Sequence, residues 1–199
     1  MPLSSDTHRH LRTVLRMSDG DACSYTDGTG LVGTGLLIGD TVQRGDEHHV
    51  THPVPVTLAV APPASKDRVR WMVEKACEVG VTRIRWLRTV HGEGRVPRHD
   101  KAMAWAQAAL EQSRRAHLAE IDPDWTMIAD LVGDLVVFDQ AGEGLSGISG
   151  PVTVLVGPEG GWAGGELPSG PRRFTLGDGV LRTETAAIVG VHAVVNALR

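Results

Sequence analysis

The chain has 199 residues, of which 41% are hydrophobic and 22% charged, and its formal net charge is −4 at pH 7. This composition is ordinary for a soluble globular protein of one domain or two small ones. No apolar run reaches membrane-spanning length and no basic-then-apolar signal segment opens the chain, which argues against a membrane-spanning or secreted protein.

The cysteines and arginines give information on the cellular compartment and the partners of the protein. Cys23 and Cys77 lie far apart without metal-ligand spacing, so we expect reduced thiols in a cytoplasmic protein and no zinc site. The acidic net charge does not favour nucleic-acid binding, which needs clustered basic residues. Such clusters are nevertheless present at Arg83, Arg85, Arg88, Arg95 and Arg98, and again at Arg114 and Arg115. The sequence is therefore compatible with a basic surface patch on an acidic protein.

Residues 10–52 contain short β-like pieces separated by turn signals. The signals are Asp19-Gly20-Asp21, Asp27-Gly28-Thr29-Gly30 and Arg44-Gly45-Asp46. Asp-Gly between apolar runs is a strong hairpin signal, and turns at this spacing predict a small β-barrel.

Two patterns in this region look functional and are set aside. Gly33-Thr34-Gly35 is half of a dinucleotide-binding fingerprint, but it lies among hairpins and no helix follows it. His48, His49 and His52 have no carboxylate or thiol at ligand spacing, so we interpret them as a solvated polar loop and expect no metal there.

After a linker marked by Pro53 and Pro55, strand and helix patterns alternate. We expect strands at 56–61, 83–89 and 135–139, and helices at 66–79, 100–118 and 185–198. Ser65 is the expected N-cap of the first helix and Gly80 its stop. This order predicts an α/β domain with a mainly parallel sheet over residues 55–199, preceded by the barrel over residues 1–54.

Two glycine turns, each fed by a strand, are the main candidate for a ligand site. Val152–Gly161 reads VTVLVGPEGG, an apolar strand that ends in a turn, and Leu176–Gly179 is a second glycine turn. Open α/β sheets bind ligands at such strand ends. The alternative is a pair of tight connections without a ligand.

The chain resembles the RsmE family of 16S rRNA uracil-N3 methyltransferases, within the SPOUT superfamily. Five blocks in the family's order carry the resemblance: Lys66-Asp67-Arg68; Lys75–Val81; Glu111-Gln112-Ser113 with Arg115; Gly157–Trp162; and Leu176-Gly177 with Val180–Ala186. The last two blocks in tandem are highly specific.

The resemblance implies a fold and an activity. The expected fold is a PUA-like β-barrel that helps grip RNA, followed by a SPOUT parallel sheet with a C-terminal trefoil knot. The expected reaction is the transfer of a methyl group from S-adenosylmethionine to N3 of one uridine in the decoding region of 16S rRNA. Two subunits are expected to pack with each active site at their interface.

Site residues follow by position from the family's blocks. The cofactor is expected to lie against Val156, Gly157, Pro158, Glu159, Gly160, Gly161, Leu176, Gly177, Val180, Leu181, Thr185 and Ala186. Arg182 is the candidate for stabilising charge on the uracil, and Arg115 for holding a phosphate or the base. Glu184 or Glu159 is a candidate proton acceptor, although each could equally cap a helix end.

The terminal helix also predicts a homodimer. It is apolar beyond one face, with Ala186, Val189, Val191, Val194, Val195 and Leu198, and such a helix must be buried on two sides. Burial within a monomer core is the alternative.

One departure from the family lies in a loop. Where members place Glu-Arg-Ser after the second strand of the catalytic domain, this chain has Thr89–Arg95, so RNA contacts there could differ. Rival readings are a SPOUT enzyme acting on another RNA and a non-catalytic RNA-binding factor for ribosome assembly.

Overall fold

The computed structural model describes the backbone of residues 1–199 and every side chain except those of Asp6, Gln140 and Ala141. The chain divides into two compact units, which are described separately. The N-terminal unit contains residues 1–52 and 115–117, and the C-terminal unit contains residues 53–114 and 118–199.

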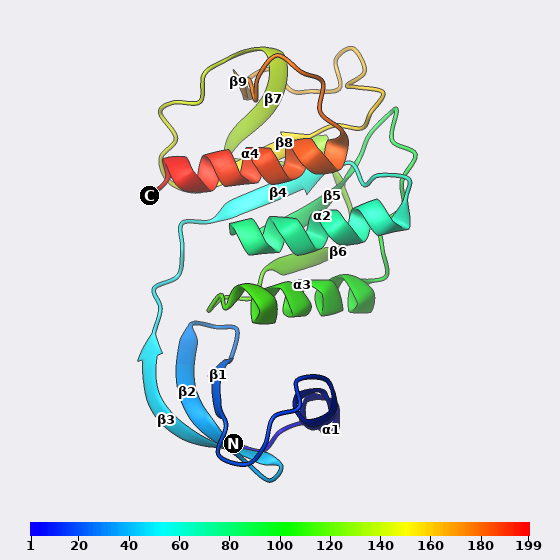
Figure 1. Cartoon of the computed structure of the whole chain (residues 1–199). Coiled ribbons are helices and arrows are strands. Elements are labelled where there is room, and N and C mark those ends of the chain that lie inside the picture. The colour runs from blue at the N-terminus through cyan, green and yellow to red at the C-terminus, as the bar shows by residue number, and fades with distance from the viewer. The chain divides into compact units, whose positions relative to one another are not determined.

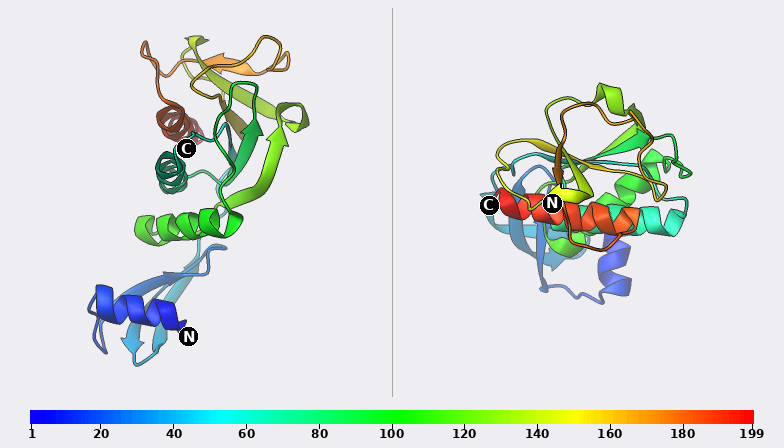
Figure 2. Two further views of the ribbon diagram at one scale, coloured as in Figure 1. Left: turned by 90° about the vertical axis from the view of Figure 1, so that its right-hand side faces the viewer. Right: turned by 90° about the horizontal axis from the view of Figure 1, so that it is seen from above.

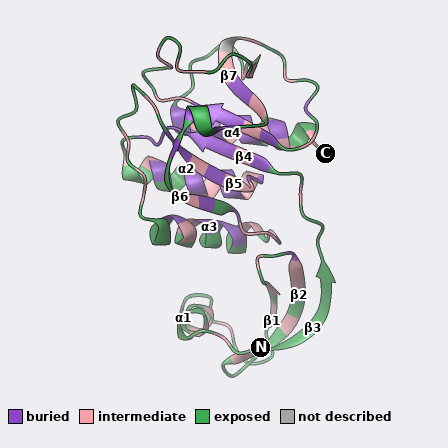
Figure 3. Cartoon of the chain, turned by 180° about the vertical axis from the view of Figure 1, so that it is seen from behind, coloured by how far each residue is buried: buried purple, intermediate pink, exposed green. Residues whose placement is uncertain are grey.

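The N-terminal unit is built on an antiparallel three-stranded sheet. Its elements are α1 (Ser5–Arg9), the π-helical turn η1 (His10–Val14), β1 (Ala22–Thr26), β2 (Leu31–Ile38) and β3 (Thr41–His49). The predicted hairpin at residues 27–30 is confirmed, because the Asp27 carboxylate there accepts hydrogen bonds from the backbone N–H groups of Thr29 and Leu31. Figure 3 shows β3 exposed along most of its length.

Two expectations for this unit were wrong. Arg44-Gly45-Asp46 is no turn but lies inside β3, and the chain reverses at Gly39, whose φ of 58° suits glycine. His48 and His49 likewise belong to β3 and not to a loop. The wrong turn arose because Gly45 serves packing: a side chain there would approach the Thr34 carbonyl oxygen to 3.1 Å.

The C-terminal unit is an α/β fold around a six-stranded parallel sheet, as predicted. Its strands are β4 (Val56–Val60), β5 (Arg83–Arg88), β6 (Glu120–Met127), β7 (Asp134–Glu143), β8 (Val152–Val156) and β9 (Arg172–Phe174). Its helices are α2 (Lys66–Val79), α3 (His99–Ser113), η2 (Ile128–Asp130) and α4 (Thr183–Ala197). The strand order is β6-β5-β4-β8-β7-β9, and every pairing is parallel. Figures 1 and 2 show α2, α3 and α4 on the same side of the sheet.

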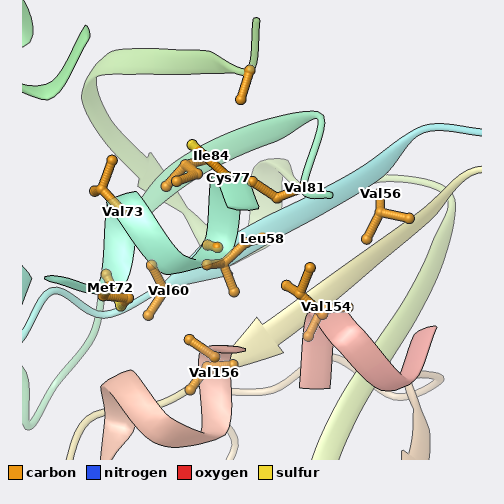
Figure 4. Close-up of a cluster of buried hydrophobic side chains, with 14 of the residues drawn as sticks. Val56, Leu58, Val60, Met72, Val73, Cys77, Val81, Ile84, Val154 and Val156 are labelled. Atoms are coloured by element: carbon orange, nitrogen blue, oxygen red, sulfur yellow. The ribbon is translucent and has the colours of Figure 1, made fainter. Parts of the chain in front are cut away.

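The core lies between the sheet and the helices. Leu58 of β4 and Val154 of β8 are fully buried and pack with Met72 of α2 and Val191 of α4, and Figure 4 shows the part of this cluster around β4, β8 and α2. The opposite face carries a smaller cluster of Ala59, Leu87, Ile128, Leu131, Val137 and Leu155. Since both faces are covered, β4 and β8 are apolar at nearly every position, as expected of central parallel strands.

The first helix matches its prediction and the second does not. α2 spans residues 66–79 and ends at Gly80, whose φ is 112°, although Ser65 makes no side-chain cap bond. Lys75 and Glu78 form an ion pair on α2 at 2.7 Å. α3 ends at Ser113, five residues before its predicted end, because Arg114 adopts a left-handed conformation with φ 54°.

The edge strand β6 was missed from sequence. Its segment, EIDPDWTM, contains a proline and three acidic residues, which are typical of turns in a single sequence. Proline is tolerated on edge strands, and the register of β6 against β5 shifts between Ile84 and Trp86 beside Pro123. The Asp122 carboxylate then pairs with both Arg83 and Arg85, so part of the arginine cluster is neutralised within the sheet.

Candidate functional site

The site lies at the carboxyl edge of the parallel sheet, where the chain leaves β4, β5 and β8. Since parallel strands deliver these ends to one edge, the loops that follow them converge. They form a pocket of about 830 Å³ lined by Pro62, Ala64, Arg68, Val90, His91, Gly92, Glu93, Glu159, Gly160 and Arg182. Figure 1 shows the loop after β5 and the start of α2 at the same end of the sheet.

The first glycine loop is a tight turn fixed to the start of α4. Val156 ends β8 and is buried, and the Gly161 N–H donates to the Pro158 carbonyl at 2.9 Å with a Gly161 φ of 72°. The Thr183 hydroxyl donates to the Gly157 carbonyl at 3.0 Å. The loop therefore presents Glu159 and Gly160 to the pocket from a fixed backbone.

The second glycine loop leaves apolar surface uncovered. Gly177 has a φ of 115°, and a side chain added there would meet no atom within 4 Å. Val180 is 86% exposed and Leu181 is 37% exposed. Exposed apolar side chains next to an accessible backbone form the kind of surface that a bound ligand or a second subunit covers.

Arg68 joins the glycine loop to α4. Its Nη1 lies 2.7 Å from Glu159 Oε1 and 3.3 Å from Glu184 Oε2. The Glu184 side chain is 7% exposed, and Arg68 is a charged partner for this buried carboxylate. Burial acts to raise the pKa of Glu159, but hydrogen bonds from its own backbone N–H and from Arg68 outweigh that effect and hold this pKa below its ordinary value.

Arg182 stands at the pocket as the residue that precedes α4. Its backbone is extended (φ −64°, ψ 154°), and its carbonyl accepts the first helical bond, from the Ala186 N–H at 2.8 Å. The side chain is exposed and lines the pocket with Arg68 and Glu159. Thr185 and Ala186 follow in the first turn of α4 and are half-buried.

The structure gathers some of the predicted site residues into one pocket, and others lie outside its lining. Glu159, Gly160 and Arg182 line one pocket, and Glu184 lies behind them on Arg68. Leu176, Gly177, Val180 and Leu181 are outside the lining of this pocket. Arg115 belongs to the N-terminal unit, where its neighbour Ala116 accepts a hydrogen bond from the Gly30 N–H at 3.0 Å.

Sequence reasoning missed three residues that build the site: Arg68, His91 and Glu166. The Glu166 carboxylate accepts hydrogen bonds from the Val90 N–H at 2.7 Å and the Ala163 N–H at 2.8 Å, which ties the loop after β5 to the glycine loop. Arg68 lies in a block that resembles the family, and that block was the signal available for it.

Two searches of the described part of the chain gave negative results. No group of three or more His, Cys, Asp and Glu side chains there is placed to hold a metal ion. Among the helices, none combines the length and apolarity that crossing a membrane requires.

Comparison with known proteins shows which family has this architecture. The profile of the RNA methyltransferase domain family matches residues 50–195. A Mycobacterium bovis protein named ribosomal RNA small subunit methyltransferase E is 30% identical over 96% of this chain and 84% of its own length. A probable rRNA methyltransferase from Porphyromonas gingivalis superposes with a TM-score of 0.84 at 27% identity, covering 98% of this chain and 92% of that one.

A ligand-bound structure is also similar. The ribosomal RNA small subunit methyltransferase E from Neisseria gonorrhoeae, bound to S-adenosylmethionine, superposes with a TM-score of 0.83 at 26% identity, covering 100% of this chain and 92% of that one. The chain therefore belongs to the RNA methyltransferase family that contains the ribosomal RNA small subunit methyltransferases E.

The Arg68 bridge predicts a pH-dependent stability. We expect Arg68→Met to lower the free energy of unfolding by about 1–3 kcal/mol at pH 7, because the buried Glu184 carboxylate loses a cationic partner. The lowered pKa of Glu159 adds stability that is present above the ordinary glutamate pKa of about 4.3 and is lost as pH falls through the folded value. The difference between wild type and variant should therefore shrink below about pH 4, as measured by urea unfolding.

Arg70→Met is the matched control on the same helix. Arg70 is exposed and pairs with Glu74 one turn away, so its loss should cost much less stability than the loss of Arg68. Equal costs for the two variants would contradict the bridging role of Arg68.

Proposed function

We propose that this protein transfers a methyl group from S-adenosylmethionine to N3 of a uridine in 16S rRNA of the small ribosomal subunit. The observation that carries the proposal is the shared pocket of Glu159, Gly160 and Arg182, because these residues come from the two blocks that most resemble uracil-N3 methyltransferases. An rRNA substrate implies action in the cytoplasm, where small subunits are assembled.

The glycine loops fit the cofactor. Side chains added at Gly161 or Gly177 would meet nothing within 4 Å, so both loops border open space that backbone groups can reach. We propose that residues 156–161 hold the cofactor with main-chain groups and that Leu176, Gly177, Val180 and Leu181 form a partly apolar wall, with Thr185 and Ala186 at the start of α4. The cofactor supplies an electrophilic methyl group on a sulfonium, and no metal is needed.

Arg182 is the group that we assign to charge stabilisation. Uracil N3 must lose its proton to become nucleophilic, and negative charge then spreads to the flanking carbonyl oxygens. A guanidinium on an exposed side chain at the pocket can donate two hydrogen bonds to such oxygens. Arg115, from the N-terminal unit, is proposed to bind an RNA phosphate or base.

The domain roles extend this assignment. We propose that residues 1–54 form a PUA-like barrel domain that binds RNA, and that residues 55–199 form the SPOUT methyltransferase domain with a C-terminal trefoil knot. The hydrogen bond from Thr183 to Gly157 supports the second proposal, since it brings the start of α4 back to the end of β8.

The proposed activity is tested by mapping the methylated positions of 16S rRNA. Incubation of small subunits or 16S rRNA from cells that lack this gene with the protein and S-adenosylmethionine should create one new N3-methyluridine. A methyl group at N3 blocks base pairing, so reverse transcription stops at that site. Methylation of tRNA or of a ribose hydroxyl instead would overturn the proposed substrate, and cofactor binding without methylation would favour a non-catalytic factor.

The cofactor site predicts an effect of Gly177→Ala. The added methyl group would enter the space proposed for the cofactor, so affinity measured by calorimetry should fall by at least about tenfold, equal to about 1.4 kcal/mol. Wild-type affinity should be unchanged by EDTA. Gly170→Ala is the matched control, because Gly170 also has a positive φ (142°) and open surroundings; equal losses in both variants would indicate backbone strain alone.

The role of Arg182 predicts a loss of rate without a loss of binding. Arg182→Ala should reduce the single-turnover rate by about a hundredfold or more, the scale for removing one oxyanion donor, while cofactor affinity and melting temperature change little. Arg182→Lys should restore only part of the rate, because an ammonium lacks the forked geometry. Arg173→Ala is the control, since Arg173 is an exposed arginine of β9 paired with Asp139. Near-normal turnover of Arg182→Ala would refute the assignment.

The exposed apolar surface predicts a homodimer. Val189 on α4 is 39% exposed, close in sequence to the exposed Val180 and Leu181, and a two-fold partner would cover such residues. Light scattering at micromolar concentration should give twice the chain mass of 21.3 kDa. A monomer mass would show that these side chains stay uncovered in solution.

A further inference from the structure

The loop after β5 places a histidine in the pocket. The loop contains Thr89–Arg95, and its residues Val90, His91, Gly92 and Glu93 line the pocket together with Arg182.

Three contacts hold the loop in place. The Val90 N–H donates to Glu166, whose other oxygen accepts from the glycine-loop residue Ala163. Gly94 packs so closely on the end of β4 that a side chain there would lie 1.8 Å from the Pro62 carbonyl oxygen. A side chain at Gly160 would lie 3.0 Å from His91 Cβ. His91 is therefore packed directly against the glycine loop.

A hydrogen bond fixes which imidazole nitrogen is free. His91 Nδ1 lies 3.1 Å from the Gly161 carbonyl oxygen. A carbonyl oxygen can only accept, so Nδ1 must carry the hydrogen. The neutral ring then has its lone pair on Nε2, the nitrogen that can accept a proton.

Two carboxylates at the site, Glu184 and Glu159, are held by Arg68. Glu184 is buried and bound to Arg68. Glu159 is bound to the same guanidinium, and its pKa lies below the ordinary value. A carboxylate stabilised in its charged form by a cation has a reduced tendency to take a proton.

We propose that His91 Nε2 is the general base that takes the N3 proton of the target uridine, which deepens the proposed function and rests on it. The N–H bond breaks and its proton moves to Nε2, giving an imidazolium. The electron pair left on N3 forms the bond to the methyl carbon, and the carbon–sulfur bond breaks with its pair remaining on sulfur. The imidazolium then returns its proton to solvent. Arg182 stabilises the charge on the uracil carbonyls while the proton is in transit.

His91→Asn separates basicity from position. The asparagine Nδ2 can still donate to the Gly161 carbonyl, but the side chain has no basic nitrogen. The single-turnover rate at pH 7 should fall by about a hundredfold or more, while melting temperature and the affinities for S-adenosylmethionine and RNA stay at wild-type values. His99→Asn, an exposed histidine at the start of α3, is the matched control and should have no effect.

A substrate with a more acidic N3–H provides a diagnostic that a structural role would not affect. In RNA whose target is 5-fluorouridine, the electron-withdrawing fluorine eases loss of the proton, so the defect of His91→Asn should shrink. Wild-type rates should rise with pH through the titration of one base, and His91→Asn should lose this limb and follow hydroxide concentration. Arg68, Glu93, Glu159 and Arg182 face the same pocket, with Glu166 behind the loop, and remain present in both proteins.

Two results would overturn the proposal. One is the finding that His91→Asn has the same rate and pH profile as the wild-type enzyme, when the wild-type enzyme does methylate the uridine. The other is a ¹⁵N NMR spectrum of the free protein that shows the His91 hydrogen on Nε2 instead of Nδ1. If wild type itself leaves the rRNA unmethylated, the proposed function fails first, and the NMR result still reports the tautomer independently.

Discussion

The in-register pairing of β4 with β8 is the constraint on which the site depends. Val56 to Val60 pair one to one with Val152 to Val156, and the Ala61 N–H extends the ladder to the Val156 carbonyl at 3.0 Å. Both strands are buried on both faces, so their apolar side chains fix the register. A shift by one residue would turn Leu58 and Val154 to the other face and move the first glycine loop relative to the loop that leads into α2. The position of the pocket is thus set by core packing far from any reactive group.

Polar contacts then convert this scaffold into a site, and they all join segments distant in sequence. Arg68 reaches Glu159 and Glu184, Glu166 reaches Val90, and Thr183 reaches Gly157. The contacts of Glu166 and Thr183 connect a loop at the carboxyl edge to another loop or to α4, and Arg68 connects α2 to the glycine loop and to α4. Since Glu184 is buried, Arg68 has a structural role as its charged partner and also lines the pocket. Stability and function are therefore coupled at this residue. The position of the glycine loop depends on this charge pair and not on local backbone propensity.

The sequence predicts local features of this protein well and long-range ones poorly, for physical reasons. α2 was placed correctly because helical periodicity and the stop at Gly80 agree, and the first glycine loop was found because the buried strand β8 runs directly into it. β6 was missed because Pro123 and its acidic neighbours are acceptable only at a sheet edge, which composition does not reveal. α3 was extended too far because Ala116 and Leu118 continue its apolar pattern, whereas the left-handed Arg114 ends it. Arg68 and His91 gain their roles from partners about 70 to 116 residues away, and no single-sequence pattern encodes such contacts.

The glycines of the first loop also illustrate how one residue type serves several constraints. Gly161 is required by its backbone, since its φ of 72° is costly for other residues. Gly160 has an ordinary φ, but a side chain there would press on His91 at 3.0 Å. Gly157 faces Trp162, whose ring atoms would lie 2.9 Å from an added Cβ. From the sequence, all three glycines were expected to lie against the cofactor. The structure divides them: Gly157 makes room for Trp162, Gly160 for the imidazole, and Gly161 for the turn itself. A substitution at Gly160 would therefore act first on the position of His91 and only through it on any ligand, so the close packing of glycine and imidazole links the shape of the loop to the chemistry of the pocket.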